Sequence, residues 1–219
     1  MKNFISILTA SYNRGRYLKK LYKSLLIQKF EKFEWIIADD GSTDNTEEII
    51  KKFIEEKKIK IIYIKSNIRI GKVVLDNVLL KKAGGKFIIH CDSDDYFAKN
   101  TFNFFSKTFI LNKNQFNKDV IGILTQNLST EGISQTYENN KFPNEKKIYS
   151  YENAKEFIKG DATIFVKKSC FINTKFPEID FVSNESVLLD GLYKNKKFIM
   201  SKKVTKIMNR TANLSVSFG

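Results

Sequence analysis

The first 97 residues alternate short apolar runs with longer amphipathic segments, and this alternation leaves few folds open. The apolar runs predict buried strands at 4–9, 33–38, 59–64 and 87–89. Apolar residues at helical spacing predict helices after Asn13, after Asp44 and over residues 72–82. Such an alternation is typical of an α/β fold with a doubly wound, mostly parallel sheet flanked by helices.

Local signals predict where these helices begin and end. Asn13 is a candidate N-cap for the first helix, and Asp44 with Glu47 has the spacing of a capping box for the second. Gly41 permits a tight turn after the second strand, and Gly84-Gly85 is expected to end the third helix.

Carboxylates follow two of the predicted strands. Asp39 and Asp40 follow the second strand, and Asp92, Asp94 and Asp95 follow the fourth. One such turn could be a solvated helix start, but two at equivalent places favour a site for a charged ligand in the crevice at the strand ends. The spacing of Asp92 and Asp94 suits a hard divalent cation that also carries phosphate oxygens, as Mg²⁺ does.

The composition sets wider limits. The 219 residues suffice for a single substantial domain over 1–219, and no apolar run reaches the roughly 18 residues that span a bilayer. Without a signal peptide, and with Cys91 and Cys170 too far apart for a disulfide framework or a zinc site, a cytoplasmic protein is expected. His90 has no second histidine for a metal site and is expected to be a hydrogen-bonded core residue.

The formal net charge of +14 suggests anionic partners. A nucleic-acid binder is one alternative, but it leaves the clustered carboxylates unexplained, since they would repel phosphate without a metal. Basic residues interleave with apolar ones near the C-terminus, which predicts one or two edge strands with a solvated face, or a surface for anionic lipid headgroups. These residues are Lys194, Lys196, Lys197, Lys202, Lys203, Lys206 and Arg210.

Four motifs in order resemble those of family 2 glycosyltransferases with the GT-A fold. Residues 7–13 (ILTASYN) resemble their opening strand and nucleotide-binding turn, and residues 35–46 (WIIADDGSTDNT) their second signature. Gly71-Lys72, with Asn77 beyond, resembles the segment that leads to a DXD motif, which here is Asp92-Ser93-Asp94 followed by Asp95. The resemblance covers residues 4–97 and rests on the order of the motifs.

The resemblance implies a donor site in the first half, residues 1–97. Base and ribose, in many relatives of a uridine, would be held by Ala10, Ser11, Tyr12 and one or both of Asp39 and Asp40. Lys72 would lie near the pyrophosphate, and Asp92, within the Asp92-Ser93-Asp94 motif, would touch the ribose. Asp94, with Asp92 beside it, would bind Mn²⁺ or Mg²⁺, while Asp95 would bind metal, sugar or only backbone.

The second half, residues 98–219, is expected to form a smaller acceptor-binding subregion. Apolar spacing predicts a helix over 98–111 with a phenylalanine core face, and a second helix over 151–159. Strands are expected at 120–125 and 162–166, with a polar insertion or loop pair at 126–149 between them.

Glu185 is the candidate general base. Ser183 or Asn184 would cap a helix that places Glu185 in its first turn, where the helix dipole favours an ionised carboxylate. Many relatives carry Glu-Asp at this point, whereas this chain has Glu185-Ser186. Asp190 and Asp180 are the other candidates.

These inferences predict an inverting, metal-dependent glycosyltransferase with a UDP-sugar donor. Its acceptor would be a hydroxyl of a glycan or lipid-linked saccharide in surface polysaccharide or lipooligosaccharide synthesis, with the enzyme in the cytoplasm or peripheral on the inner membrane face. A sugar-phosphate nucleotidyltransferase is the other enzymatic alternative. It would normally show a glycine-rich basic loop after the first strand, and residues 10–15 contain only one glycine.

Overall fold

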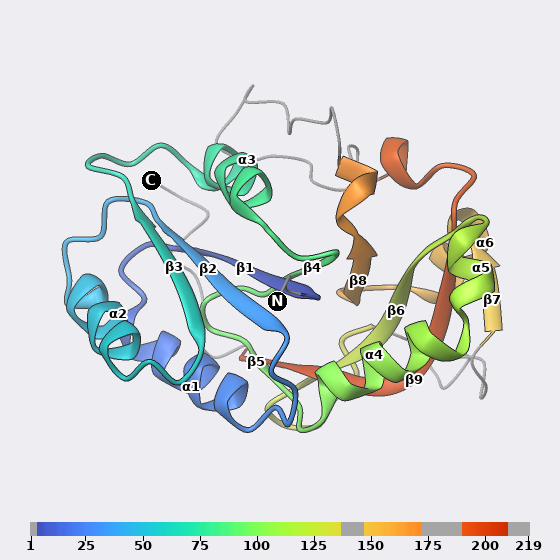
Figure 1. Cartoon of the computed structure of the whole chain (residues 1–219), viewed down its shortest axis with the longest axis horizontal. Helices are drawn as coiled ribbons and strands as arrows, with labels where there is room; N and C mark the ends of the chain where they lie inside the picture. The colour runs from blue at the N-terminus through green and yellow to red at the C-terminus, as the bar shows by residue number, and fades with distance from the viewer. Residues whose placement is uncertain (1–3, 137–146, 172–189, 210–219) are drawn as a thin grey trace.

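The computed structural model describes residues 4–136, 147–171 and 190–209 of the chain. This part is a mixed α/β fold built on one nine-stranded sheet with helices on both faces (Figure 1). The strand order is β3-β2-β1-β4-β8-β6-β9-β5, and β7 pairs with β9 outside this path.

Most elements lie where the apolar pattern predicts them. The described strands are β1 Ile5–Ser11, β2 Phe33–Asp39, β3 Lys60–Lys65, β4 Phe87–His90, β5 Tyr96–Phe97, β6 Val120–Ser129, β7 Lys147–Ser150, β8 Thr163–Lys167 and β9 Lys197–Met208. The described helices are α1 Gly15–Leu26, α2 Thr46–Glu55, α3 Lys72–Lys82, α4 Thr101–Leu111, α5 Lys113–Asn117 and α6 Tyr151–Phe157, followed by a 3-10 turn at Lys168–Phe171.

Strands β3, β2, β1 and β4 are parallel, as the sequence predicts. Alternate residues of each strand face opposite layers: Trp35 and Ile37 pack in a core with α1 and α2, whereas Ile36 and Ala38 pack in a core with α3. Figure 1 shows α1 and α2 on one side of these strands and α3 on the other. All four carboxyl ends therefore point to the same edge of the sheet.

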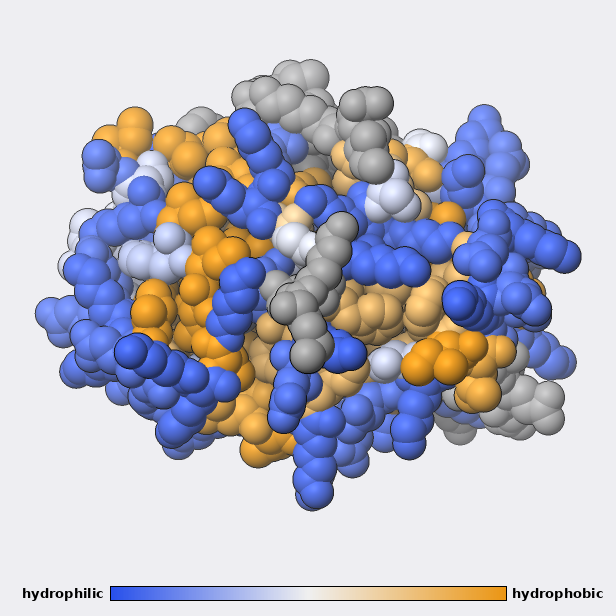
Figure 2. Space-filling view, viewed as in Figure 1, coloured by the Kyte–Doolittle hydropathy of each residue, from blue (hydrophilic) through white to orange (hydrophobic). Residues whose placement is uncertain are grey.

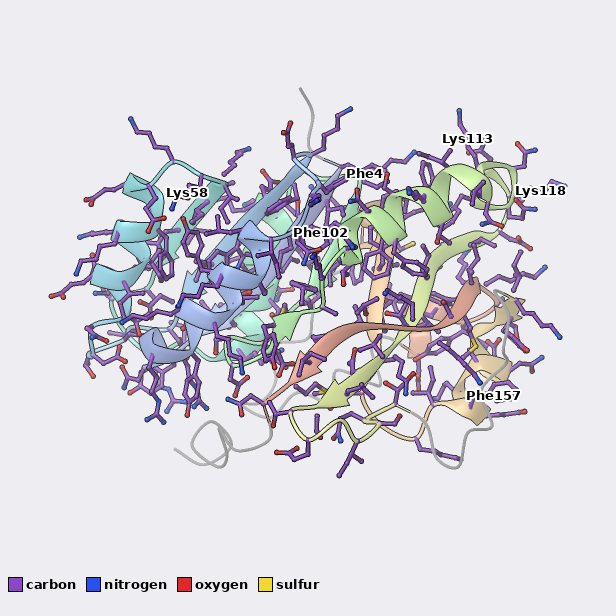
Figure 3. The ribbon with its side chains drawn as sticks, turned by 90° about the horizontal axis from the view of Figure 1, so that it is seen from below. Phe4, Lys58, Phe102, Lys113, Lys118 and Phe157 are labelled. Atoms are coloured by element: carbon purple, nitrogen blue, oxygen red, sulfur yellow. The ribbon has the colours of Figure 1, made fainter. Side chains whose placement is uncertain are left out.

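The second half continues the same sheet with mixed directions. β8 runs antiparallel to β4 and β6, and β9 runs parallel to β6. The rings of Phe87 and Phe105 stack on Phe165 with centroids 4.3 and 4.7 Å away, so phenylalanines of β4, α4 and β8 join the two halves. Figure 3 labels Phe102, a buried member of this aromatic core, and Phe4, which is partly buried and packs against it.

The predicted edge position of the C-terminal strand is wrong. β9 lies inside the sheet, with β6 along one side and β7 and β5 along the other. Lys202 and Lys203 are exposed where the register between β6 and β9 shifts after Thr125, so basic residues are tolerated at an irregularity rather than at an edge. The loop prediction for 126–149 is wrong at both ends, because residues 126–129 extend β6 and residues 147–149 belong to β7. Helix α4 begins three residues late because Asn100 has a φ of 63°.

The capping predictions are also wrong: Asn13 joins two loops instead, and Asp44 accepts the Thr46 N–H at 3.0 Å without forming a capping box with Glu47. Asn13 Oδ1 accepts the N–H groups of Thr43 (2.9 Å) and Asp44 (3.2 Å), and Arg14 is the N-cap of α1. Asn45 is the N-cap of α2, while Glu47 pairs with Lys51 at 2.8 Å. The first two loops at the carboxyl edge are thus tied to each other.

Glu34 is buried at the amino end of β2 and ties this end of the sheet together. Its carboxylate accepts hydrogen bonds from Ser6 Oγ, Gly84 N–H and Lys60 Nζ, each at 2.7 Å. Burial alone would raise the pKa of Glu34, but these bonds hold it below the ordinary 4.5. Gly85 allows this packing because a Cβ there would meet the Ser6 nitrogen at 2.6 Å.

Replacing Glu34 with alanine is expected to lower the free energy of unfolding by about 3 kcal/mol, because the buried Ser6 hydroxyl and the Gly84 N–H would both lose their acceptor. Urea denaturation followed by circular dichroism measures this. Glu48→Ala, at an exposed position of α2, is the control and should change stability by at most about 0.5 kcal/mol.

The pH dependence has a defined sign. A lowered carboxyl pKa adds stability above the ordinary value of 4.5, and this stability is lost as the pH falls through the folded-state pKa. When the pH is lowered from 5, Glu34→Gln should therefore lose less stability than wild type. A loss in Glu34→Gln as steep as that of wild type would contradict the role of the Glu34 charge.

Candidate active site

The end of β1 carries Ala10, Ser11 and Tyr12. Ser11 Oγ is buried and has no hydrogen-bond partner within the described residues, which is uncommon for a buried hydroxyl. Ala10 and Tyr12 are partly exposed. A hydroxyl without a protein partner at a strand end suits a ligand that brings its own polar group.

Both carboxylates at the end of β2 organise the surrounding loops. Asp39 accepts hydrogen bonds from Ser42 N–H (2.9 Å) and the Tyr63 hydroxyl (2.7 Å); burial, then Asp39, raises the pKa of Tyr63. Asp40 Oδ1 accepts the N–H groups of Ile70 (2.7 Å) and Gly71 (3.1 Å). Each oxygen has two lone pairs, so both carboxylates can accept a further hydrogen bond, although Asp39 and Asp40 are buried.

Arg69, which sequence reasoning missed, links two of these loops. Its guanidinium lies 4.3 Å from the centroid of the Tyr12 ring, and its Nε lies 3.7 Å from Asp40 Oδ2. The loop before α3 thereby covers the turn after β1. A single arginine in a polar loop gives no sequence signal for this contact.

Lys72 lies in the first turn of α3 and pairs with the buried Asp76 at 3.0 Å. His90, at the end of β4, places Nδ1 3.8 Å from the other oxygen of Asp76. The His90 side chain is 39% exposed, so the prediction of a core imidazole is wrong. Asp76 thus brings two basic side chains to the carboxyl edge beside the acidic turn.

The acidic turn follows β4 directly. Asp92 is exposed, Asp94 is half-buried, and Ser93 and Asp95 are buried. Burial, then the charges of Asp95 and Asp92, raise the pKa of Asp94, while the nearby Arg14 opposes this. The crowding of negative charge expected from the sequence is therefore present in the fold.

Lys206 of β9 supplies a cation that sequence reasoning did not place here. Its ammonium lies 3.0 Å from Asp95 Oδ2, and both side chains are at least nine-tenths buried. Burial would lower the pKa of Lys206, but Asp95 and Asp92 raise it overall. The prediction of a solvated face or lipid-contacting surface is thus wrong for Lys206.

The comparisons with known proteins settle the family. A family model described as Glycosyl transferase family 2 matches residues 6–170. The chain belongs to this family. The family expected from the four motifs is confirmed, whereas the nucleotidyltransferase and nucleic-acid alternatives gain no support.

Among its family 2 relatives is the poly(ribitol-phosphate) beta-N-acetylglucosaminyltransferase TarS of Staphylococcus aureus, 33% identical over 60% of this chain and 22% of TarS. A GalNAc(5)-diNAcBac-PP-undecaprenol beta-1,3-glucosyltransferase of Campylobacter jejuni is 26% identical over 90% of this chain and 62% of that protein. The chain thus spans less than two thirds of the length of either relative.

Solved structures confirm the GT-A fold. TarS 1–349 of S. aureus in complex with UDP-GlcNAc has a TM-score of 0.77 at 20% identity, covering 99% of this chain and 61% of that one. The mannosyltransferase PcManGT of Pyrobaculum calidifontis, in complex with GDP-Man and Mn²⁺, has a TM-score of 0.67 at 15% identity, covering 94% and 57%.

The chemistry of the acidic turn fits a divalent cation of the kind common in GT-A enzymes. Asp92 and Asp94 are oxygen donors one residue apart, and their mutual repulsion would be relieved by a cation. No group of three or more His, Cys, Asp and Glu side chains converges on a metal position within the described ranges. By their chemistry, Asp92 and Asp94 are the residues that would hold such a cation.

Of the three candidate bases, Asp190 lies within the described residues. Glu185 and Asp180 lie outside the described residues. Asp190 accepts hydrogen bonds from the Tyr151 hydroxyl (2.9 Å) and Lys155 Nζ (2.7 Å), and these partners, Lys155 first, lower the pKa of Asp190. A carboxylate with a lowered pKa is a weak base, which makes Asp190 a poorer candidate.

A groove of about 1470 Å³ lies at the opposite, amino edge of the sheet. Phe4, Phe33 and Ile59 line it from the strand starts, and no predicted site residue contributes to it.

Figure 2 shows hydrophobic surface in the middle of one face of the molecule, with hydrophilic residues around it. The described part contains no helix long and apolar enough to cross a membrane.

Proposed function

We propose that this chain transfers a sugar from a nucleoside diphosphate donor, most simply a UDP-sugar, to an acceptor hydroxyl with inversion at the anomeric carbon. The observation that carries the proposal is the acidic turn of Asp92, Asp94 and Asp95 beside the loops of β1 and β2 in a family 2 chain. The similarity to a structure described with UDP-GlcNAc supports the donor class.

The nucleoside would bind at the ends of β1 and β2. Tyr12 offers a ring face for the base, although the Arg69 guanidinium lies over the ring, 4.3 Å from its centroid. Asp39 or Asp40 would accept the uracil imide N–H with a lone pair that the loop contacts leave over. Ser11 Oγ, buried without a partner in the described part, would gain its hydrogen bond from the nucleoside.

The diphosphate would lie between Lys72 and the acidic turn. Lys72 brings positive charge to the start of α3, and Arg14 adds a cation near Asp94. Asp92 and Asp94 would hold Mn²⁺ or Mg²⁺, which when bound offsets the charge of the departing diphosphate. Without a cation, the carboxylates repel the diphosphate.

The acceptor would be a hydroxyl of a glycan or a lipid-linked saccharide in the synthesis of a surface polysaccharide. The support is the relatedness to TarS and to the Campylobacter glucosyltransferase. A lipid-linked acceptor would place the enzyme at the cytoplasmic face of a membrane. The described C-terminal basic residues that are exposed, and that would contact anionic headgroups, are Lys194, Lys196, Lys197, Lys202 and Lys203.

UDP is expected to bind weakly in chelator and at least about tenfold more tightly with Mn²⁺, because a diphosphate approaches Asp92 and Asp94 favourably only with a cation between them. Isothermal titration calorimetry in EDTA and in Mn²⁺ measures this, and release of UDP from UDP-sugars tests turnover. UMP, which lacks the diphosphate, is the control and should depend less on Mn²⁺. Equal UDP affinity in both buffers would contradict the proposal.

A further inference from the structure

The buried ion pair between Asp95 and Lys206 joins positions 111 residues apart in the chain. The side chain of Lys206 is 8% exposed and that of Asp95 is 5% exposed, with 3.0 Å between Nζ and Oδ2. Buried charges are costly unless they are paired, so each residue accounts for the burial of the other.

The end of β9 holds the acidic turn at further points. β5, which follows Asp95 directly, pairs with β9 in the register Tyr96↔Ile207 and Phe97↔Lys206. The Asn209 N–H donates to Asp95 Oδ1 at 3.2 Å. One oxygen of Asp95 therefore faces the ammonium of Lys206 in β9, and the other accepts the N–H of Asn209, the residue after β9.

Asp92 and Asp94 differ from Asp95 in their burial. Asp92 is exposed and Asp94 is half-buried, whereas Asp95 is buried. A carboxylate that already faces an ammonium and an N–H is poorly disposed to ligate a cation as well, since the ammonium would lie next to the metal. The Asp95–Lys206 pair thus divides the acidic turn into one buried acid that is neutralised internally and two acids that solvent reaches.

We propose that Lys206 is a positioning residue that keeps Asp95 as an internal counter-ion, leaving Asp92 and Asp94 as the carboxylates that bind a divalent cation. This inference rests on the proposed function, because it concerns the same cation. Asp95 would then affect cation binding through its charge and not as a metal ligand.

A charge-balanced pair of substitutions tests the inference. Asp95→Asn leaves the Lys206 ammonium uncompensated beside the cation, so Mn²⁺ affinity measured with UDP present should fall by about tenfold or more. Lys206→Met leaves an uncompensated carboxylate and should bind Mn²⁺ at least as tightly as wild type. The double variant removes both charges and should return to within about threefold of wild type.

Calorimetry with Mn²⁺ and UDP gives the affinities, and circular dichroism shows that each variant is folded. Lys206→Arg keeps the charge and should also lie within about threefold of wild type. If Lys206→Met does not fold, the comparison of Asp95→Asn with the double variant still decides, because the double variant contains no unpaired charge.

The outcomes separate the possible roles. A double variant as weak as Asp95→Asn would make Asp95 a direct metal ligand and overturn the inference alone. Equal Mn²⁺ affinity in all folded variants would reduce the pair to a structural one and also overturn it. Absence of Mn²⁺ binding by wild type with UDP would overturn both the inference and the metal dependence of the proposed function.

Discussion

Replacing Asp94 with asparagine is expected to lower sugar transfer by about 10³-fold and to remove the Mn²⁺ dependence of UDP binding. The physical reason is that asparagine keeps the shape of the side chain but loses the charge that attracts the cation. Burial and the neighbouring Asp95 and Asp92 already raise the pKa of Asp94. Removing one of these charges should therefore relieve repulsion in the fold, and thermal stability should not fall.

Turnover with a UDP-sugar and calorimetry with UDP and Mn²⁺ measure the two effects. Asp119→Asn is the matched control, since Asp119 is an exposed carboxylate that pairs with Lys197 at 2.6 Å just before β6. It should leave transfer and metal dependence unchanged. An Asp94→Asn protein that binds UDP normally with Mn²⁺ would show that the metal is held elsewhere.

The sequence predicts the first half of the fold well, because the signals there are local. Helix α3 has the predicted bounds of 72–82, and β1, β2 and β4 lie within two residues of the apolar runs. Parallel strands buried on both faces give continuous apolar runs, and these are hard to mistake. The carboxylates at the ends of β2 and β4 follow from the same strand assignments.

What the sequence could not provide are contacts between distant positions. Arg69 over Tyr12 and Lys206 beside Asp95 join residues that no local pattern connects. Lys206 lies in a stretch rich in lysine, and the sequence alone does not distinguish the buried lysine from the exposed ones around it. Its burial depends on a partner far away in the chain.

The helix caps failed for a related physical reason. Asn13 has the composition of an N-cap, but its side chain hydrogen-bonds the loop after β2, 30 residues away. The same donors and acceptors can satisfy either a helix end or a neighbouring loop, and tertiary structure decides between them. At the carboxyl edge of the sheet the Asn13 side chain bonds the loop, and this contact holds the turns after β1 and β2 together.

Glu185→Gln is expected to lower the transfer rate by about 10²–10⁴-fold while donor affinity persists. The proposed direct displacement needs a base on the face opposite the leaving nucleotide, and the residues proposed to bind the donor all come from the first half of the chain. The base must therefore come from the second half. There Asp190 is already bound by Tyr151 and Lys155, which lower its pKa, so Glu185 remains the best candidate.

Glutamine retains the size of Glu185 and its capacity to accept a hydrogen bond, but it cannot take the proton of the acceptor hydroxyl. The rate should fall with the UDP-sugar bound, so single-turnover transfer would be slow while calorimetry with UDP and Mn²⁺ stays at the wild-type value. Asp190→Asn is the control, because it removes a carboxylate from the same half and should affect stability more than rate. If Asp190→Asn or Asp180→Asn abolishes transfer and Glu185→Gln does not, the base is misassigned. If the product keeps the anomeric configuration of the donor, the displacement is not direct.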